Sequence, residues 1–221
     1  MHAPRGGRRL AGIVAVLGWP ALSLQLVLTL QLATANGKSL AGGLIVYFSF
    51  FTILTNVLAA LTVTLPPALP GSRAGRFFAR PDVATGVAAS IAIVGITYSV
   101  LLRHTWNPQG LQRVADIALH DLMPIAFLIW WWVAVPADRL RWSAAAAWAL
   151  YPLVYFGYAL AHGAQSGQYA YPFIDVGAVG YGRVVLNGLG ILAVFLVVGL
   201  GLIAVGRWKG RRQAEAASAS R

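Results

Sequence analysis

The chain has 221 residues, of which 58% are hydrophobic and 10% are charged, and its mean hydropathy is +0.69. This composition indicates an integral membrane protein. The net charge of +11 does not indicate a nucleic-acid partner, because the 17 Lys and Arg are scattered over loops instead of gathering on one face. The sequence has no cysteine, which excludes disulfides, thiolate chemistry and cysteine-ligated metals.

Six stretches are long enough to cross a hydrocarbon core, which requires about 20 apolar residues. They cover residues 10–34, 41–65, 83–103, 111–135, 142–162 and 184–206. The connections between them are short, so a separate soluble domain is excluded. We therefore predict an all-α integral membrane protein whose six transmembrane helices form one domain, residues 1–206. The remaining residues, 207–221, form a basic tail that we expect to be disordered.

The cations divide unevenly when consecutive loops are assigned to alternate sides of a six-helix path. Thirteen fall on one side: Arg5, Arg8, Arg9, Arg73, Arg76, Arg80, Arg139, Arg141, Arg207, Lys209, Arg211, Arg212 and Arg221. The four others are Lys38, Arg103, Arg113 and Arg183. By the positive-inside rule both termini are cytoplasmic. The preference for Arg over Lys, with abundant Ala and Gly, indicates a bacterial genome and hence a bacterial plasma membrane.

The first stretch, residues 10–34, follows an Arg-rich start and precedes Ala33-Thr34-Ala35, which is similar to a signal-peptidase site. A cleaved secretory signal is the alternative interpretation of this segment. The apolar stretch is too long for a typical signal peptide, so we predict that it is retained as the first transmembrane helix.

The second stretch carries a narrow polar stripe at helical spacing in an otherwise apolar helix. Its members are Ser49, Thr52, Thr55 or Asn56, Ala59 and Thr62. Small and hydroxyl residues often line contacts between membrane helices, so packing alone would explain the stripe. A functional interpretation needs a partner from another helix.

The fourth stretch supplies such a partner. His120 and Asp121 lie near the start of its apolar run, and ionisable groups at that depth are costly and usually mark function. Asp116 precedes His120 by one helical turn and is close enough to orient the imidazole. We expect this helix to begin near Asn107 and Pro108, which would place His120 at a depth similar to that of Thr52.

The fifth stretch carries an aromatic stripe of Tyr151, Tyr155 and Tyr158 that ends in His162. Packing or interfacial anchoring is the usual role of such a stripe, and His162 is expected to be solvated at the helix end. The loop that follows, with Asp175 and Arg183, either caps a cavity from outside or is an ordinary exposed loop.

Three motifs together resemble the androgen-induced-gene family, which includes the androgen-dependent TFPI-regulating protein. They are FFTILTNVLAAL with Thr52, the histidine-containing start of the fourth helix with Pro124 after it, and AYPFIDVG around Tyr171. The resemblance spans the six helices in order, although the interval from His120 to Pro124 is one residue shorter here. It implies an intramembrane threonine hydrolase that cleaves fatty acid esters of hydroxy fatty acids, with the catalytic roles on Thr52 and His120.

The resemblance, together with these residues, implies a lipid-ester hydrolase with a lipid-like substrate drawn from the membrane and with no cofactor or metal. The catalytic residues are Thr52 as nucleophile and His120 as base, because a neutral imidazole can take a hydroxyl proton and later return it to the leaving alcohol. The supporting residues are Asn56 as an oxyanion donor, Thr55 as a competing hydroxyl, and Asp116, Asp121 and His162.

Three other functions remain as alternatives. A small transporter or proton-coupled carrier could use the same buried His and Asp, although no pair of Gly/Pro-broken helices marks two halves of the chain. A haem or metal protein could use His104, His120 and His162, although no compact ligand motif is present. A rhomboid-like serine protease is disfavoured because the sequence has no GxSxG motif.

Overall fold

The computed structural model describes residues 5–219 and is helical nearly throughout, with no strand in this range. In chain order the elements are α1 (Arg5–Ala35), α2 (Leu40–Phe48), α3 (Phe51–Ala68), α4 (Arg73–Phe78), α5 (Pro81–Thr97), η1 (Tyr98–Leu102), α6 (Gly110–Ile117), η2 (Ala118–Leu122), α7 (Met123–Ala134), α8 (Ala144–Trp148), α9 (Leu150–Ser166), η3 (Pro172–Ile174) and α10 (Val176–Ala219). The elements η1 and η2 are turns of π-helix, and η3 is a short 3-10 helix.

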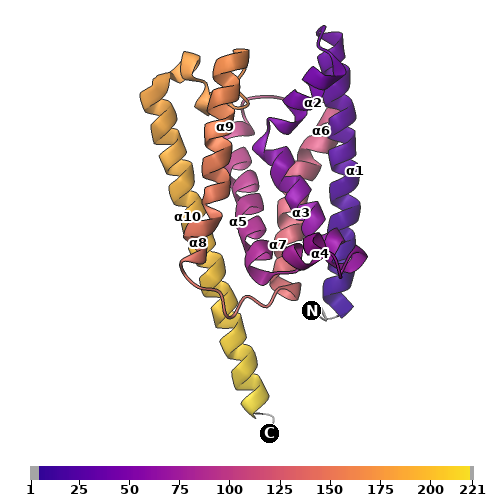
Figure 1. The fold of residues 1–221 in the computed structure, drawn as a ribbon, viewed down its shortest axis with the longest axis vertical. Helices are drawn as coiled ribbons and strands as arrows, with labels where there is room; N and C mark the ends of the chain where they lie inside the picture. Colours follow the sequence, from indigo (N-terminus) through magenta and orange to yellow (C-terminus); the bar gives the residue numbers. More distant parts are fainter. Residues whose placement is uncertain (1–4, 220–221) are drawn as a thin grey trace.

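Six helical stretches are long and apolar enough to cross a membrane. They are Gly6–Ala35, Phe51–Ala68, Pro81–Leu102, Gly110–Ala134, Ala144–Ser166 and Val176–Ala219. These correspond in order to the six predicted spans, so the all-α fold is confirmed. Figure 1 shows one upright bundle in which α1 starts and α10 ends at the same end. The chain therefore has the architecture of an integral membrane protein.

Helix α5 lies at the centre of the bundle, with α1, α3 and α7 on one side and α9 and α10 on the other (Figure 1). Its buried face consists largely of small residues, among them Ala84, Ala88 and Ala89, which allow the neighbouring helices to approach closely. Gly86 must be small, because a Cβ atom there would lie 2.7 Å from the Trp148 ring.

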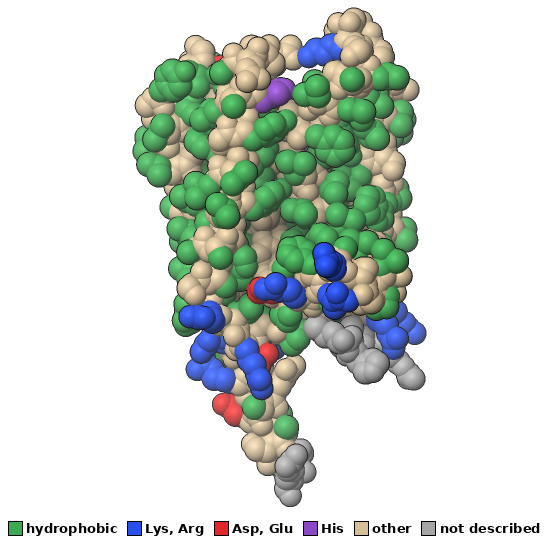
Figure 2. Space-filling model, viewed as in Figure 1, with side chains coloured by type: hydrophobic (Ala, Val, Ile, Leu, Met, Phe, Trp, Pro, Cys, Tyr) green, Lys and Arg blue, Asp and Glu red, His purple; other side chains and the backbone are tan. Residues whose placement is uncertain are grey.

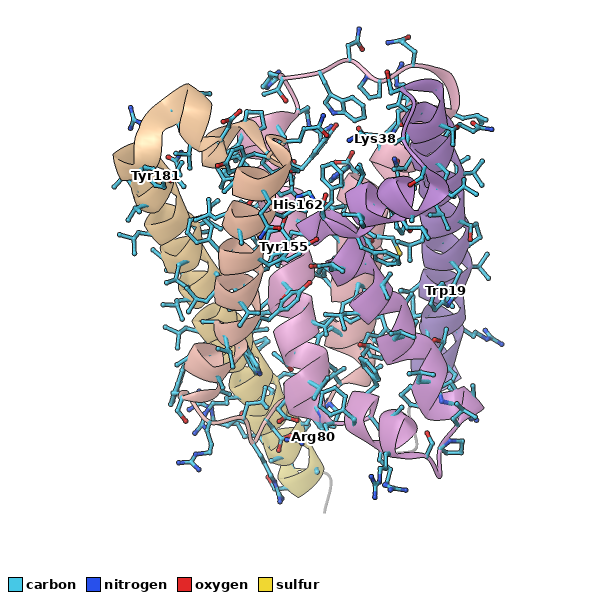
Figure 3. All side chains as sticks on the ribbon, turned by 45° about the horizontal axis from the view of Figure 1, so that its top comes forward. Trp19, Lys38, Arg80, Tyr155, His162 and Tyr181 are labelled. Atoms are coloured by element: carbon cyan, nitrogen blue, oxygen red, sulfur yellow. The ribbon has the colours of Figure 1, made fainter. Side chains whose placement is uncertain are left out.

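The outer surface of the bundle is apolar, and the cations gather at its ends. Figure 2 shows hydrophobic side chains over the flank, with Lys and Arg concentrated at the end from which α10 protrudes. Val16, Val100 and Val197 are each about 70% exposed, as expected of side chains that face lipid. We call the Arg-rich end the basic end and the other the charge-poor end; Arg80 and Lys38 mark them in Figure 3. The assignment of the basic end to the cytoplasm stays a prediction.

The second span differs from the expected continuous helix over residues 41–65. The chain breaks between α2 and α3, where Ser49 Oγ donates to the Val46 carbonyl and Phe50 is extended, with ψ 130°. A break leaves main-chain groups unpaired. Tyrosines from the other side of the bundle supply partners: the Tyr155 hydroxyl donates to the Ser49 carbonyl at 2.9 Å, and the Thr52 N–H donates to the Tyr171 hydroxyl at 3.3 Å.

The fourth span also departs from a regular α-helix. It begins at Gly110 and not near Asn107, and it widens into the π-turn η2 in the middle. Pro124 gives a physical reason, since it has no N–H to donate to the His120 carbonyl four residues earlier. Single turns of π-helix inside α-helices are frequent at functional sites.

The C-terminal segment is helical where we expected disorder. Helix α10 continues through residues 207–219, which include good helix formers such as Ala, Arg and Gln. The last two residues of the predicted tail, 220–221, lie outside the described part of the chain. Near its start α10 is bent at Gly180, whose φ of +75° is readily adopted only by glycine.

Candidate active site

The structure brings together the two side chains on which the predicted catalyst depends. Thr52, in the first turn of α3, places its Oγ1 3.3 Å from Nε2 of His120 in η2. Thr52 is 8% exposed, and the His120 side chain is 16% exposed, so both lie inside the bundle. A hydroxyl and an imidazole at this distance can exchange a proton.

The other imidazole nitrogen is held by Asp116. His120 Nδ1 lies 3.0 Å from the Asp116 main-chain carbonyl and 3.1 Å from its carboxylate Oδ1. The hydrogen bond is directed at the carbonyl, while the carboxylate lies at ion-pair distance. Both Asp116 oxygens are hydrogen-bond acceptors, so Nδ1 must be the nitrogen that donates. In the neutral imidazole, Nδ1 therefore carries the proton and Nε2 presents its lone pair to Thr52. This is the tautomer that a general base needs.

Tyr98 completes the support of the imidazole. Its ring stacks on His120, with centroids 4.1 Å apart and planes 14° from parallel, and its hydroxyl donates to Asp116 Oδ2. Tyr98 is the first residue of η1, so both π-turns contribute to the site. The Arg103 guanidinium lies over the Tyr98 ring, 4.8 Å from the ring centroid, and forms an ion pair with Asp121. Asp121 is therefore engaged in a partly exposed ion pair beside the site and not with His120.

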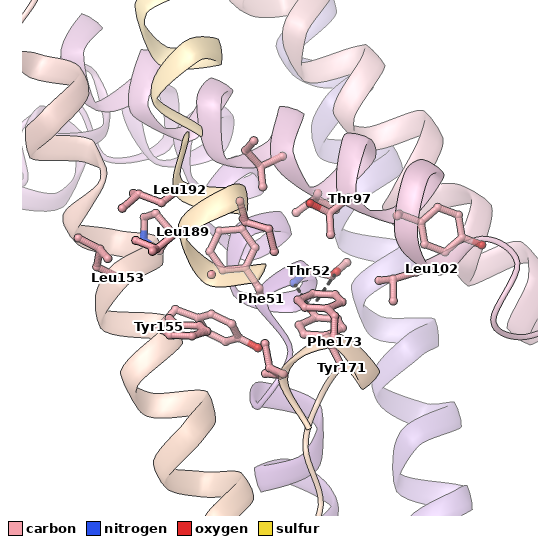
Figure 4. Close-up of a pocket in the computed structure, with 18 of the residues that line it drawn as sticks. Phe51, Thr52, Thr97, Leu102, Leu153, Tyr155, Tyr171, Phe173, Leu189 and Leu192 are labelled. Atoms are coloured by element: carbon pink, nitrogen blue, oxygen red, sulfur yellow. Dashed lines mark hydrogen bonds between the residues drawn. The ribbon is translucent and has the colours of Figure 1, made fainter. Parts of the chain in front are cut away.

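Tyr171 contacts Thr52 from the loop between α9 and α10. Its hydroxyl accepts from the Thr52 N–H and lies 3.5 Å from Thr52 Oγ1, as the dashed lines in Figure 4 indicate. Burial of the phenol raises the pKa of Tyr171 above its usual value, although the residue as a whole is only partly buried. The phenol thus keeps its proton and can donate a hydrogen bond to Thr52 Oγ1 or to a bound substrate.

Two predicted supporting residues, Thr55 and Asn56, have other partners. Thr55 is fully buried, and its Oγ1 lies 3.0 Å from the Tyr151 hydroxyl. The Asn56 amide donates to the main-chain carbonyls of Thr52 and Leu119, at 2.8 and 3.2 Å. Both amide hydrogens are thereby used, one within α3 and one to join α3 to η2, so the structure does not offer Asn56 as the expected oxyanion donor.

His162 lies in α9, where its ring stacks on Tyr158 (5.9 Å between centroids, 29° between planes), toward the charge-poor end (Figure 3). His104 is exposed in the loop that follows η1. Within residues 5–219, no three His, Asp or Glu side chains are grouped closely enough to hold a metal ion.

Two cavities meet at Thr52. The first, the apolar groove, has a volume of about 170 Å³ and is drawn in Figure 4. It is lined mainly by hydrocarbon side chains of α5, α9, α10 and the loop before α10, such as Ile93, Leu153, Phe173, Leu189 and Leu192. The second, which we call the polar chamber, has a volume of about 290 Å³; polar groups of His120, Asp116, Gln25, Gln112 and Thr29 line it together with apolar side chains such as Phe50, Ile53 and Leu119. Thr52, Tyr98 and Tyr171 line both cavities.

The sequence did not identify all of these residues. Tyr98 carries no local signal beyond being a tyrosine near the end of the third span, and its role depends on a π-turn. Tyr171 belongs to the AYPFIDVG motif, but its contact with Thr52 requires the break between α2 and α3.

Comparison of the chain with protein-family models, with curated proteins and with solved structures gave no match. The family resemblance therefore stays a prediction from the quoted motifs.

Proposed function

We propose that this protein hydrolyses lipid esters inside the membrane, with Thr52 as the nucleophile and His120 as the general base. The observation that carries the proposal is the 3.3 Å approach of Thr52 Oγ1 to His120 Nε2, where the apolar groove meets the polar chamber. Of the two neighbouring hydroxyls, those of Thr52 and Thr55, we assign the nucleophile to Thr52, because the Thr55 hydroxyl is hydrogen-bonded to Tyr151 and not to His120.

In the first step, His120 Nε2 takes the proton of Thr52 while Oγ1 attacks the ester carbonyl carbon. The tetrahedral intermediate collapses as the bond to the alcohol oxygen breaks, and the imidazolium returns its proton to that oxygen. The products are a free alcohol and an acyl ester of Thr52. In the second step, His120 activates a water molecule that attacks this ester and releases the fatty acid, which restores the hydroxyl of Thr52.

The negative charge that develops on the carbonyl oxygen needs donors. Phe50, the N-cap residue of α3, makes no side-chain cap, so the first main-chain N–H groups of the helix are candidates; the Thr52 N–H, which donates to the Tyr171 hydroxyl in this structure, is one of them. We assign the second donor to Tyr171, whose hydroxyl lies within hydrogen-bonding distance of Thr52. The positive end of the α3 dipole favours the same charge.

The substrate reaches the site from the bilayer through the apolar groove. Leu153 and Leu189, which line the groove, are 47% and 58% exposed on the flank of the bundle, so the groove opens toward lipid. Fatty acid esters of hydroxy fatty acids, implied by the family resemblance, belong to the lipid-ester class. We further propose a bacterial plasma membrane with the basic end in the cytoplasm, on the basis of composition and the positive-inside rule.

The test is the substitution Thr52→Ala in the full chain, purified in detergent or nanodiscs. We expect loss of ester hydrolysis and of labelling by a fluorophosphonate probe, with the wild-type label mapping to Thr52 by mass spectrometry. Thr52→Ser should retain measurable activity, because a serine hydroxyl can occupy the same position.

Thr62→Ala is the matched control, since the Thr62 hydroxyl donates only to the Leu58 carbonyl of its own helix. It should keep both hydrolysis and labelling. Persistence of both in folded Thr52→Ala protein would refute the nucleophile assignment.

A further inference from the structure

The two cavities at Thr52 differ in chemistry. The apolar groove offers hydrocarbon side chains and a few hydroxyls, and it opens on the lipid-facing flank at Leu153, Val185 and Leu189, which are all about half exposed. Such a surface suits a long acyl chain, which gains free energy by leaving water and needs no polar partner.

The polar chamber lies on the other side of Thr52 and carries a ladder of hydrogen-bonding groups. Gln112 Nε2 donates to Gln25 Oε1 at 2.8 Å, and Gln25 Nε2 donates to Thr29 Oγ1 at 3.1 Å. Exposed Thr105 and Trp106 line the chamber from the loop at the charge-poor end. Amides and hydroxyls of this kind bind uncharged hydroxyl groups well.

The charge of the polar chamber limits what it can hold. Among the described residues that line it, none is a Lys or Arg, while Asp116 is an acid. Arg103 packs over the Tyr98 ring but is paired with Asp121 and does not line the chamber. A carboxylate or phosphate placed there would lose water without gaining a cation and would be repelled by Asp116.

We infer that the preferred substrate is an ester of one long acyl chain with an uncharged, hydroxyl-bearing alcohol, and not the fatty acid ester of a hydroxy fatty acid that the family resemblance implies. This inference rests on the proposed hydrolase function. The acyl chain occupies the apolar groove, the ester carbonyl lies at Thr52, and the alcohol occupies the polar chamber, from which it leaves at the charge-poor end. A monoacylglycerol is the simplest lipid of this class.

The test compares three oleoyl esters with wild-type protein in nanodiscs: 1-monooleoylglycerol, methyl oleate, and the oleoyl ester of 12-hydroxystearic acid. They share the acyl chain and differ in an alcohol that is hydroxylated, apolar or anionic. We expect kcat/KM for monooleoylglycerol to be at least about tenfold higher than for either other ester, which corresponds to one or two neutral hydrogen bonds.

Equal rates for the three esters would mean that the chamber holds only water, and faster cleavage of the anionic ester would mean that it accepts a carboxylate. Either result overturns the inference while leaving a hydrolase in place. If none of the esters is cleaved and Thr52 is not labelled by the fluorophosphonate, the proposed function itself fails, and this inference fails with it.

A variant sharpens the assignment of the chamber. Gln112→Leu should lower kcat/KM for monooleoylglycerol about fivefold and leave methyl oleate unchanged. Gln109→Leu is the matched control, because Gln109 is exposed and bonds only to Asn107 among the described contacts. Equal losses on both substrates in Gln112→Leu would assign Gln112 a purely structural role and contradict the inference, and the wild-type comparison is independent of either variant.

Discussion

The two halves of the bundle use the same polar residue types differently. Toward the basic end, the hydroxyls of Thr62, Thr64 and Ser90 each donate to a carbonyl four residues earlier in the same helix, at 2.7 to 2.9 Å. Toward the charge-poor end, Thr52 and Thr55 face side chains of other elements. A hydroxyl on a membrane helix is thus available for chemistry only where another element brings a partner to it.

The halves also differ in what fills them. The basic half is packed with large apolar side chains, including Phe127, Met123 and Trp131, and the Trp131 indole N–H donates to Thr85 Oγ1 at 2.9 Å. Both cavities described above lie in the other half, beside the interrupted helices α2 and α3 and the two π-turns. Irregular backbone therefore accompanies the polar site, and regular helix accompanies the close-packed core.

Removal of the His120 imidazole is the most direct test of this difference between the two halves. His120→Gln should reduce ester hydrolysis by about 10³-fold or more, because the general base is lost while a polar side chain of similar size remains. His162→Gln, which changes a histidine stacked on Tyr158, should leave the rate within about twofold. Steady-state hydrolysis in nanodiscs measures both, and equal losses in the two variants would contradict the assignment of His120.

Tyr171→Phe tests the second oxyanion donor. Loss of the hydroxyl should lower kcat about 100-fold with little change in KM, since the bond forms mainly in the transition state. Tyr158→Phe is the control, because Tyr158 is 41% exposed on α9. A Tyr171→Phe protein that turns over at the wild-type rate would assign the oxyanion to main-chain donors alone.

Asp116→Asn tests the support behind the imidazole. An amide keeps the shape but removes the charge and can reverse the bonds to Tyr98 and His120, so we expect kcat to fall about tenfold. Asp121→Asn removes a charge paired with Arg103 outside the site and should change kcat less than twofold. If Asp121→Asn proves the more harmful, the tautomer argument for His120 is wrong.

Thr55→Val should have the smallest effect on activity, less than about threefold. It deletes the hydrogen bond to Tyr151 from a fully buried position and should lower the free energy of unfolding by about 1 kcal/mol. Thr62→Val is the matched substitution in the basic half. Thermal unfolding in detergent, together with the hydrolysis assay, separates stability from catalysis, and a large catalytic loss in Thr55→Val would return Thr55 as a nucleophile candidate.

Hydropathy and charge were sufficient to predict the six spans, because burial in lipid demands long apolar helices and because the loops between them are short. The depth of His120 followed from the same count of residues, which placed it level with Thr52, and the two side chains do meet in the structure. The tail was expected to be disordered but is helical through residue 219, because a run of helix-forming residues attached to α10 extends that helix.

The interruptions of the helices were not predictable from periodicity. The stripe through Ser49, Thr52 and Thr62 fits a continuous helix, yet the chain turns at Phe50 because the tyrosines of a distant segment satisfy the main-chain groups that the break exposes. The role of Tyr98 depends in the same way on the η1 turn. Tertiary partners decide such positions, and a single sequence carries no direct record of them.

The π-turn at η2 also makes the approach of His120 to Thr52 sensitive to chain length. A π-turn holds one residue more than an α-turn, and one residue of an α-helix corresponds to a rotation of about 100°. Loss of a single codon between Ala118 and Leu122 would let the fourth span relax into an unbroken α-helix of nearly the same length and hydropathy. The apolar outer surface of that helix would be retained, while the imidazole would turn away from Thr52, so a relative could keep this fold and lose the contact between these two side chains by one deletion.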